Sequence, residues 1–228
     1  MDYDKTVNEY NVSLAASRAF FSKVFTYMAG GLAITGALSY LVGTSPELIS
    51  IMIGESGLNL FGYIVMFAPV ILVFVLSARI QKMSPMAAMS TFIIYSALMG
   101  LSLSFIFLAY AGETIFTTFL ITGGTFACMA ILGYTTKTDL SKMGSVLYIA
   151  LFGIIIAMLV NFFLGSSTLD YIISLAGVAI FTGLTAYDMQ RLKEYSYQVD
   201  VNDENGSKMA IMGALTLYLD FINLFLFL

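Results

Sequence analysis

Apolar runs long enough to cross a lipid bilayer dominate this sequence. Seven are present, at about residues 20–42, 58–78, 86–111, 115–134 and 144–164, from near Tyr171 onward, and at 209–228. A helix of about 20 apolar residues spans the hydrocarbon core of a bilayer, where the backbone has no water to bond to. The chain is 59% hydrophobic and only 11% charged. These features predict an all-α polytopic membrane protein with seven transmembrane helices.

The chain outside these runs is short and polar. Residues 1–17 are predicted to form a cytoplasmic N-terminal tail, frayed or lying at the interface, because they lack the apolar core of a cleaved signal peptide. Residues 18–228 are predicted to form a single transmembrane domain. Gly43 to Gly57, with Glu55, is predicted to be an outer loop. The net charge of −4 belongs to loops and tail, so no nucleic-acid partner is expected.

All basic residues fall on one side of this predicted topology. They are Lys5, Arg18, Lys23, Arg79, Lys82, Lys137, Lys142, Arg191, Lys193 and Lys208. Because cytoplasmic loops carry the excess of Lys and Arg, the N-terminus is predicted to be cytoplasmic. Seven full spans would place the C-terminus outside. No charge follows the last run, so charge alone leaves a re-entrant seventh segment open.

The residues needed for several kinds of chemistry are missing. The chain has no histidine, which removes the commonest zinc ligand and the side chain that usually titrates near neutral pH. Cys128 is the only cysteine, so neither an internal disulfide nor a cysteine-based metal site is expected. A nucleophile elbow and a phosphate-binding loop are also lacking. The chain is therefore not expected to be an enzyme or to carry a cofactor.

Two carboxylates lie deep in apolar sequence. Asp188 stands in the sixth run and Asp220 inside the last one. A charge within the hydrocarbon region is costly, so an ionisable residue there indicates a functional site. The segments that carry them, Gly183-Leu-Thr-Ala-Tyr-Asp188-Met-Gln and Leu217-Tyr-Leu-Asp220-Phe-Ile-Asn223-Leu-Phe, resemble those of the Bax inhibitor-1 family, also called the transmembrane Bax inhibitor motif family.

The resemblance extends from about Ala16 to Leu228 and is closest to bacterial members. Relatives often show Tyr-Asp-Thr-Gln where this chain has Tyr187-Asp188-Met189-Gln190, so a neighbouring hydroxyl is lost here. The resemblance implies seven helices, with the C-terminal helix central and wrapped by the other six. It also implies a calcium leak that pH controls through the aspartates matching Asp188 and Asp220. The membrane it implies is the bacterial cytoplasmic membrane.

The residues themselves fit that site. Two carboxyl groups in a low-dielectric pocket cannot both ionise cheaply, so they are expected to share a proton and titrate as a pair. Without the proton they repel or require a cation. Calcium takes about six to eight oxygen ligands, more than Asp188 and Asp220 offer. Asn223 could add a carbonyl oxygen, with backbone and water supplying the rest. This favours transient passage of calcium over a tight site.

Depth in the membrane constrains the pairing. If the sixth helix ended at Arg191 and the seventh began at Met209, the two aspartates would lie at different depths. A sixth helix that continues to about Tyr197 would bring them level, which leaves Val199 to Ser207 as an exposed loop. Acidic residues in that loop suggest an EF-hand, but the twelve-residue pattern and its terminal Glu are missing. A solvated turn is preferred.

Two arginines are candidate counter-ions for the aspartates. Arg79 ends the second run, where it either anchors the helix in the positive-inside manner or latches the aspartate pair shut. Arg191 lies three residues after Asp188 and is the rival partner.

The leading hypothesis is a pH-sensitive calcium-permeable leak whose partners are the bilayer, calcium and protons. The alternative is a non-transporting regulator that binds a membrane protease or another membrane complex. The aspartates could also form a purely structural hydrogen-bonded clamp. An intramembrane aspartyl protease is disfavoured, because the residues around the two aspartates do not match that class.

Overall fold

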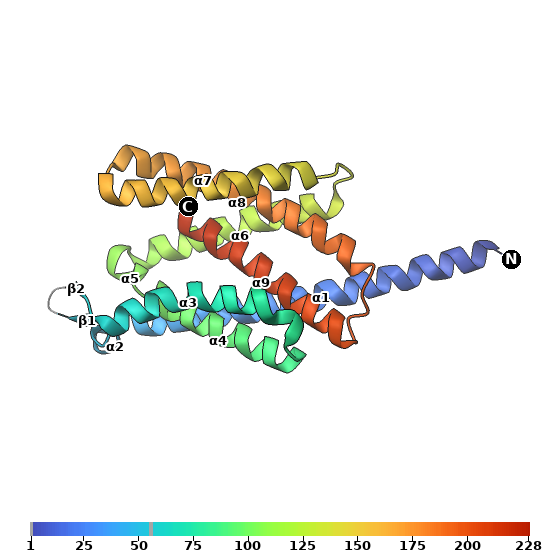
Figure 1. Ribbon diagram of the computed structural model, residues 1–228, viewed down its shortest axis with the longest axis horizontal. Helices are drawn as coiled ribbons and strands as arrows, with labels where there is room; N and C mark the ends of the chain where they lie inside the picture. The colour runs from blue at the N-terminus through green and yellow to red at the C-terminus, as the bar shows by residue number, and fades with distance from the viewer. Residues whose placement is uncertain (1, 55–56) are drawn as a thin grey trace. The chain divides into compact units, whose positions relative to one another are not determined.

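The structure is a computed structural model that describes residues 2–54 and 57–228, with side chains from residue 14 onward. The elements in chain order are α1 (Asp2–Gly43), α2 (Pro46–Ser50), β1 (Ile53–Gly54), β2 (Gly57–Leu58), α3 (Leu60–Arg79), the 3-10 helix η1 (Ile80–Lys82), α4 (Pro85–Leu103), α5 (Ile106–Ala109), α6 (Gly112–Thr135), α7 (Ser141–Leu164), α8 (Ser167–Ser196) and α9 (Glu204–Phe227) (Figure 1).

Seven helical stretches of the described chain are long and apolar enough to cross a membrane. They are Leu14–Gly43, Leu60–Lys82, Pro85–Ala109, Gly112–Thr135, Ser141–Leu164, Ser167–Ser196 and Glu204–Phe227. The predicted fold class, an all-α protein with seven transmembrane helices, is confirmed. The seventh stretch is one continuous helix of 24 residues, long enough to span. That this helix is wrapped by the other six stays a prediction.

The chain divides into two units. The first comprises Met1–Ile115 and Val199–Leu215, and the second comprises Phe116–Gln198 and Thr216–Leu228. In the first unit α4 packs along both α1 and α3. Gly100 of α4 lies against the backbone of Thr35 in α1, with no room for a side chain. Small residues of this kind let membrane helices approach closely, which is how α1 and α4 pack.

Three details of the first unit differ from the sequence-based prediction. The outer loop contains α2 and a short hairpin of β1 and β2, held over a buried cluster of Val42, Ile49, Met52 and Val65. Glu55 lies outside the described residues. The third span is interrupted after Leu103, where the Ser104 hydroxyl donates to the Leu101 carbonyl, 2.6 Å away. A side-chain bond of this kind competes with helical hydrogen bonding.

The N-terminal tail, expected to be frayed or to lie at the interface, is the third difference, because its described residues are helical. The backbone of α1 is helical from Asp2 and continues without a break into the first span. Once a helix has nucleated, each further residue adds a hydrogen bond at little cost, so the apolar span can extend into polar sequence. Met1 lies outside the described residues.

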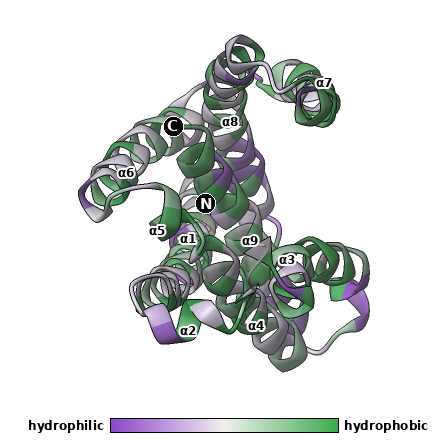
Figure 2. Ribbon diagram, turned by 90° about the vertical axis from the view of Figure 1, so that its left-hand side faces the viewer, coloured by the Kyte–Doolittle hydropathy of each residue, from purple (hydrophilic) through white to green (hydrophobic). Residues whose placement is uncertain are grey.

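In the second unit α7 runs beside α8 (Figure 1). α7 is strongly apolar along most of its length (Figure 2), and only 6% of its most apolar stretch is buried. The sixth helix has the longer of the two predicted lengths, because α8 continues to Ser196 and Tyr197 caps it. The predicted start of the last helix at Met209 is wrong by one turn and more, since α9 begins at Glu204.

The early start of α9 has a local cause. The Glu204 carboxylate pairs with the Lys208 ammonium one turn later, at 3.1 Å, a spacing that supports a helix. The connection between α8 and α9 is therefore shorter than the predicted loop of 199–207.

Candidate functional site

The side chains of Asp188 and Asp220 meet in the second unit. Both are buried, with 3% and 5% of their surface exposed. Each carboxyl group lies within hydrogen-bonding reach of the other, and the two interact electrostatically. Asp188 belongs to the buried face of α8, where Phe181, Leu184, Asp188 and Leu192 recur at helical spacing. The structure thus brings together the two aspartates that the sequence singled out.

Their meeting does not follow from equal depth. Asp188 lies eight residues before the end of α8 and Asp220 sixteen residues after the start of α9. At 1.5 Å per residue these positions are about 12 Å and about 24 Å from the helix ends. α8 and α9 therefore contact each other at positions that lie at different distances from their connected ends. The expected contact between the two aspartates is present, but the argument from helix length does not account for it, and their role as a proton sensor stays a prediction.

A third polar group touches the pair. The Tyr148 hydroxyl of α7 lies 3.5 Å from Asp188 Oδ1 and 3.4 Å from Oδ2, so it donates a long, shared hydrogen bond. Sequence reasoning missed Tyr148. No local signal in the sequence marks it, since it is one of 14 tyrosines and 38% of its surface is exposed.

One glycine makes room for this contact. A side chain at Gly144 of α7 would lie 2.6 Å from the ring of Tyr187. Because Gly144 has no side chain, the Tyr187 ring fits against its backbone. The same ring packs edge-on against the Tyr148 ring, with centroids 6.1 Å apart. Long helical side chains lean toward the N-terminus of their helix. Tyr148 can therefore reach back one turn along α7, to the level where α8 carries Asp188.

The second oxygen of Asp220 has no hydrogen-bond partner among the described residues, although it is buried. An unpaired buried carboxylate oxygen is costly, whereas the carbonyl oxygen of a neutral carboxyl group costs far less. The arrangement is consistent with one proton held between Asp188 and Asp220. The ring of Phe221 follows Asp220 and packs against Phe119 and Phe126 of α6, at 5.3 and 5.7 Å between centroids. Aromatic side chains thus line this part of α9.

The other predicted site residues differ in their surroundings. Arg191 is exposed; its Nε donates to the Tyr195 hydroxyl at 2.9 Å, and its guanidinium lies over that ring. Its charge also acts on Asp188, but no ion pair joins them among the described residues. Asn223 donates its amide to the Leu219 carbonyl, 2.8 Å away within its own helix. Arg79 is exposed in the last turn of α3, in the first unit.

The described residues offer few ligands to a metal ion. No group of three or more His, Cys, Asp or Glu side chains gathers anywhere among them. The acidic loop before α9 bonds to its own backbone instead: Asp200 accepts from the Asn202 amide at 2.9 Å, and Asp203 accepts from Gly206. Such bonds are those of an Asx turn.

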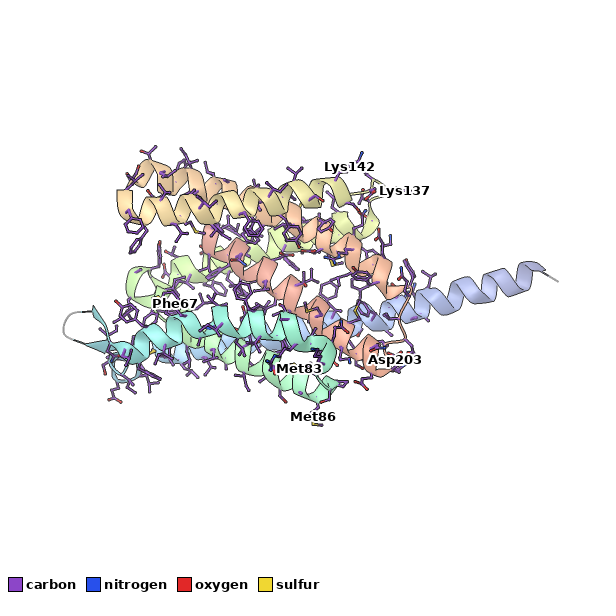
Figure 3. The ribbon with its side chains drawn as sticks, in the orientation of Figure 1. Phe67, Met83, Met86, Lys137, Lys142 and Asp203 are labelled. Atoms are coloured by element: carbon purple, nitrogen blue, oxygen red, sulfur yellow. The ribbon has the colours of Figure 1, made fainter. Side chains whose placement is uncertain are left out.

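The loop between α6 and α7 lies against α8 beside the aspartate site. Figure 3 shows Lys137 in this loop and Lys142 near the start of α7, at the same end of the second unit. Gln190 accepts from the Leu140 amide and donates to the Thr138 carbonyl, both at 2.8 Å. An open pocket of about 240 Å³ lies over this region. Its lining residues are Thr136, Lys137, Asp139, Gln190, Lys193, Glu194 and Tyr197.

Asp139 of this loop accepts a hydrogen bond from the first residue of α7. Its Oδ1 accepts from the Ser141 amide at 2.8 Å. The side-chain and backbone hydrogen bonds from Ser141 hold the pKa of Asp139 below its ordinary value. A carboxylate at a helix N-terminus also interacts favourably with the helix dipole. The loop therefore has stabilising contacts of its own in addition to those with Gln190.

Seven membrane-length helices, with a buried carboxyl pair on the last two of them, define a polytopic membrane protein. The family described as "Inhibitor of apoptosis-promoting Bax1" matches residues 17–228. The chain belongs to this Bax inhibitor-1 family.

Bacterial relatives match almost the whole chain. Inner membrane protein YbhL of Escherichia coli K12 is 44% identical over 215 residues, which is 94% of this chain and 91% of that protein. An uncharacterized protein of Borreliella burgdorferi is 44% identical over 209 residues, 92% and 89% of the two chains. Protein RP147 of Rickettsia prowazekii is 41% identical over 231 residues, 100% and 96% of the two chains.

Proposed function

We propose that this protein is a pH-sensitive, calcium-permeable leak of the membrane and that Asp188 and Asp220 form its proton sensor. The observation that carries the proposal is the buried contact between these two carboxyl groups, with one Asp220 oxygen left without a partner among the described residues. Membership of the Bax inhibitor-1 family supports the same reading.

The number of protons held by Asp188 and Asp220 links pH to the affinity of the pair for calcium. With one shared proton, the carboxyl groups of Asp188 and Asp220 attract each other and fasten α8 to α9. Loss of that proton leaves two negative charges that repel each other or bind a cation. The pair therefore attracts calcium more strongly as pH rises through its titration. Two carboxylates fill only part of the oxygen shell that calcium requires, which favours release after binding.

Calcium is the permeant species here, with no cofactor and no catalytic reaction. Asn223 is a candidate accessory ligand through its side-chain oxygen, and Arg79 and Arg191 are candidate counter-ions of the closed state. The lipid bilayer is the protein's medium. The name of the Escherichia coli relative, an inner membrane protein, supports placement in a bacterial cytoplasmic membrane. The ten basic residues favour a cytoplasmic N-terminus and an outer C-terminus.

Calcium flux into liposomes tests the sensor. Purified wild type, Asp188→Asn, Asp220→Asn and the double variant are compared from about pH 6 to pH 8 with an enclosed calcium dye. Asn keeps the size and hydrogen bonding of Asp but cannot ionise. Each single variant is expected to shift or abolish the pH dependence, and the two effects are expected to be non-additive, because both changes break one pair.

Two results would contradict the proposal in different ways. A common pH midpoint in all four proteins would remove the aspartates from the sensor. A wild type that passes no calcium at any pH would favour the second candidate, a regulator that binds a membrane protease or another membrane complex without transport. The polar α6–α7 loop and its open pocket would suit that candidate, since they offer a partner a surface outside the spans.

A further inference from the structure

The side chain of Gln190 forms two hydrogen bonds with the backbone of the α6–α7 loop. Its carbonyl oxygen accepts from the Leu140 amide and its amide donates to the Thr138 carbonyl. Glutamine is suited to this task because its amide carries an acceptor and a donor side by side. Neither glutamate nor alanine can make both bonds. The residue sits two positions after Asp188 on the same helix.

A second contact from α8 fixes the other side of the same loop. Lys193 donates to the Tyr134 carbonyl at 2.7 Å, and its ammonium lies 4.9 Å from the centroid of the Tyr134 ring. Tyr134 belongs to the last turn of α6, whose carbonyls lack helical partners. Gln190 and Lys193 thus tie both the end of α6 and the approach to α7 onto α8.

The hydrogen bond at Leu140 fixes the start of α7. Leu140 precedes Ser141, the first residue of that helix. From there a continuous helix leads to Gly144, where the Tyr187 ring packs, and then to Tyr148, which contacts Asp188. A helix is rigid over two turns, so a fixed start sets the position of the Tyr148 hydroxyl.

We propose that Gln190 is a positioning residue of the aspartate site. It holds the α6–α7 loop on α8 and, through the first turns of α7, keeps the Tyr148 hydroxyl on Asp188. The loop is thereby a point outside the spans from which a bound partner could alter the site. The consequence for calcium rests on the function proposed above, whereas the positioning itself does not.

The rival explanation is that packing alone places α7. The fit of the Tyr187 ring against Gly144, and of Leu147 against Gly183, would then hold Tyr148 without help from the loop. Under that explanation the bonds of Gln190 order the loop and do nothing further. The two explanations differ in what happens at Tyr148 when Gln190 is changed.

The experiment places 3-fluorotyrosine at position 148 and reads its fluorine resonance at fixed pH in calcium-free buffer. The same label at position 187 serves as a second reporter. Gln190→Ala removes both bonds, and Gln190→Glu keeps an acceptor for the Leu140 amide but loses the donor to Thr138. Gln198→Ala, at an exposed position two residues after the end of α8, is the control. Hydrogen exchange of residues 136–142 is followed in parallel.

In Gln190→Ala, exchange of the Leu140 amide within residues 136–142 is expected to quicken on the order of fivefold, because that amide loses its one hydrogen bond to Gln190. The resonance at position 148 is expected to move toward that of an Asp188→Asn protein, with a smaller shift in Gln190→Glu and none in Gln198→Ala. Faster loop exchange with an unmoved resonance at 148 would overturn the proposal, and so would unchanged exchange.

The readouts separate this inference from the leak. If wild type passes no calcium but Gln190→Ala still moves the resonance at 148, the positioning role stands and the leak fails. If wild type leaks and the resonance stays in place, the leak stands and the positioning role fails.

Discussion

At the scale of single residues, the α7–α8 contact depends on the absence of a side chain at Gly144. The Tyr187 ring fits where a side chain would be, and Tyr148 packs on that ring and reaches Asp188. Gly153 lies further along the same helix with open space around it. The two glycines therefore form a matched pair for a test of this contact.

Gly144→Ala is expected to destabilise the protein by about 1–3 kcal/mol, the usual effect of overpacking. The added methyl group would meet the Tyr187 ring at 2.6 Å, so one helix must shift. Gly153→Ala is expected to be neutral or stabilising, since alanine favours a helix by up to about 1 kcal/mol over glycine. Unfolding in mixed detergent micelles measures both. Equal stability of the two variants would contradict the account of this contact.

Some residues of the site could be predicted from the sequence and others could not. Asp188 and Asp220 could be predicted because a carboxylate in apolar sequence is conspicuous by itself. Tyr148 and Gln190 could not, because nothing local distinguishes them from other polar residues near span ends. Their partners lie 40 and 50 residues away, and only the pairing of α7 with α8 brings them together.

At the scale of elements, helix existence was predictable and helix ends were less so. The apolar runs gave seven spans, because hydrocarbon thickness fixes the length of each. The extra turn of α9 depends on a Glu204–Lys208 pair, and the interruption after α4 on the hydroxyl of Ser104. These are contacts of single side chains. Hydropathy does not register them.

Which side of the membrane each connection occupies can be tested with single cysteines. Cys128, which is exposed, is first replaced by alanine. Cysteine at Thr44 is expected to react with an impermeant maleimide from outside, and cysteine at Asn202 only after the membrane is opened. The reverse pattern would overturn the orientation inferred from the ten basic residues.

At the scale of the whole molecule, the family and the number of membrane-length helices are established, and the role of Arg79 is a prediction. Arg79 ends α3 in the first unit, and the aspartates lie in the second. A latch formed by Arg79 would make the closed state depend on both units. Simple anchoring would not.

Arg79→Ala distinguishes these roles. If Arg79 latches the closed state, the variant is expected to raise calcium flux into liposomes at neutral pH severalfold while the protein stays folded. Lys82→Ala, which removes a neighbouring positive charge, is the control and is expected to leave flux unchanged. Altered cysteine labelling without altered flux would show that Arg79 only anchors its helix.

Three of the lysines that predict the orientation also donate to backbone carbonyls. Lys23 bonds to Val201, Lys193 to Tyr134 and Lys208 to Gln81, across 178, 59 and 127 residues of chain. During synthesis the chain emerges from its N-terminus, so α1 is made long before Val201 exists. If the N-terminus is cytoplasmic, as the basic residues predict, Lys23 has two roles: its charge directs insertion, and its ammonium later donates to Val201 in the folded protein. A reversal of charge at Lys23 is therefore expected to affect both the insertion of α1 and the stability of the folded protein.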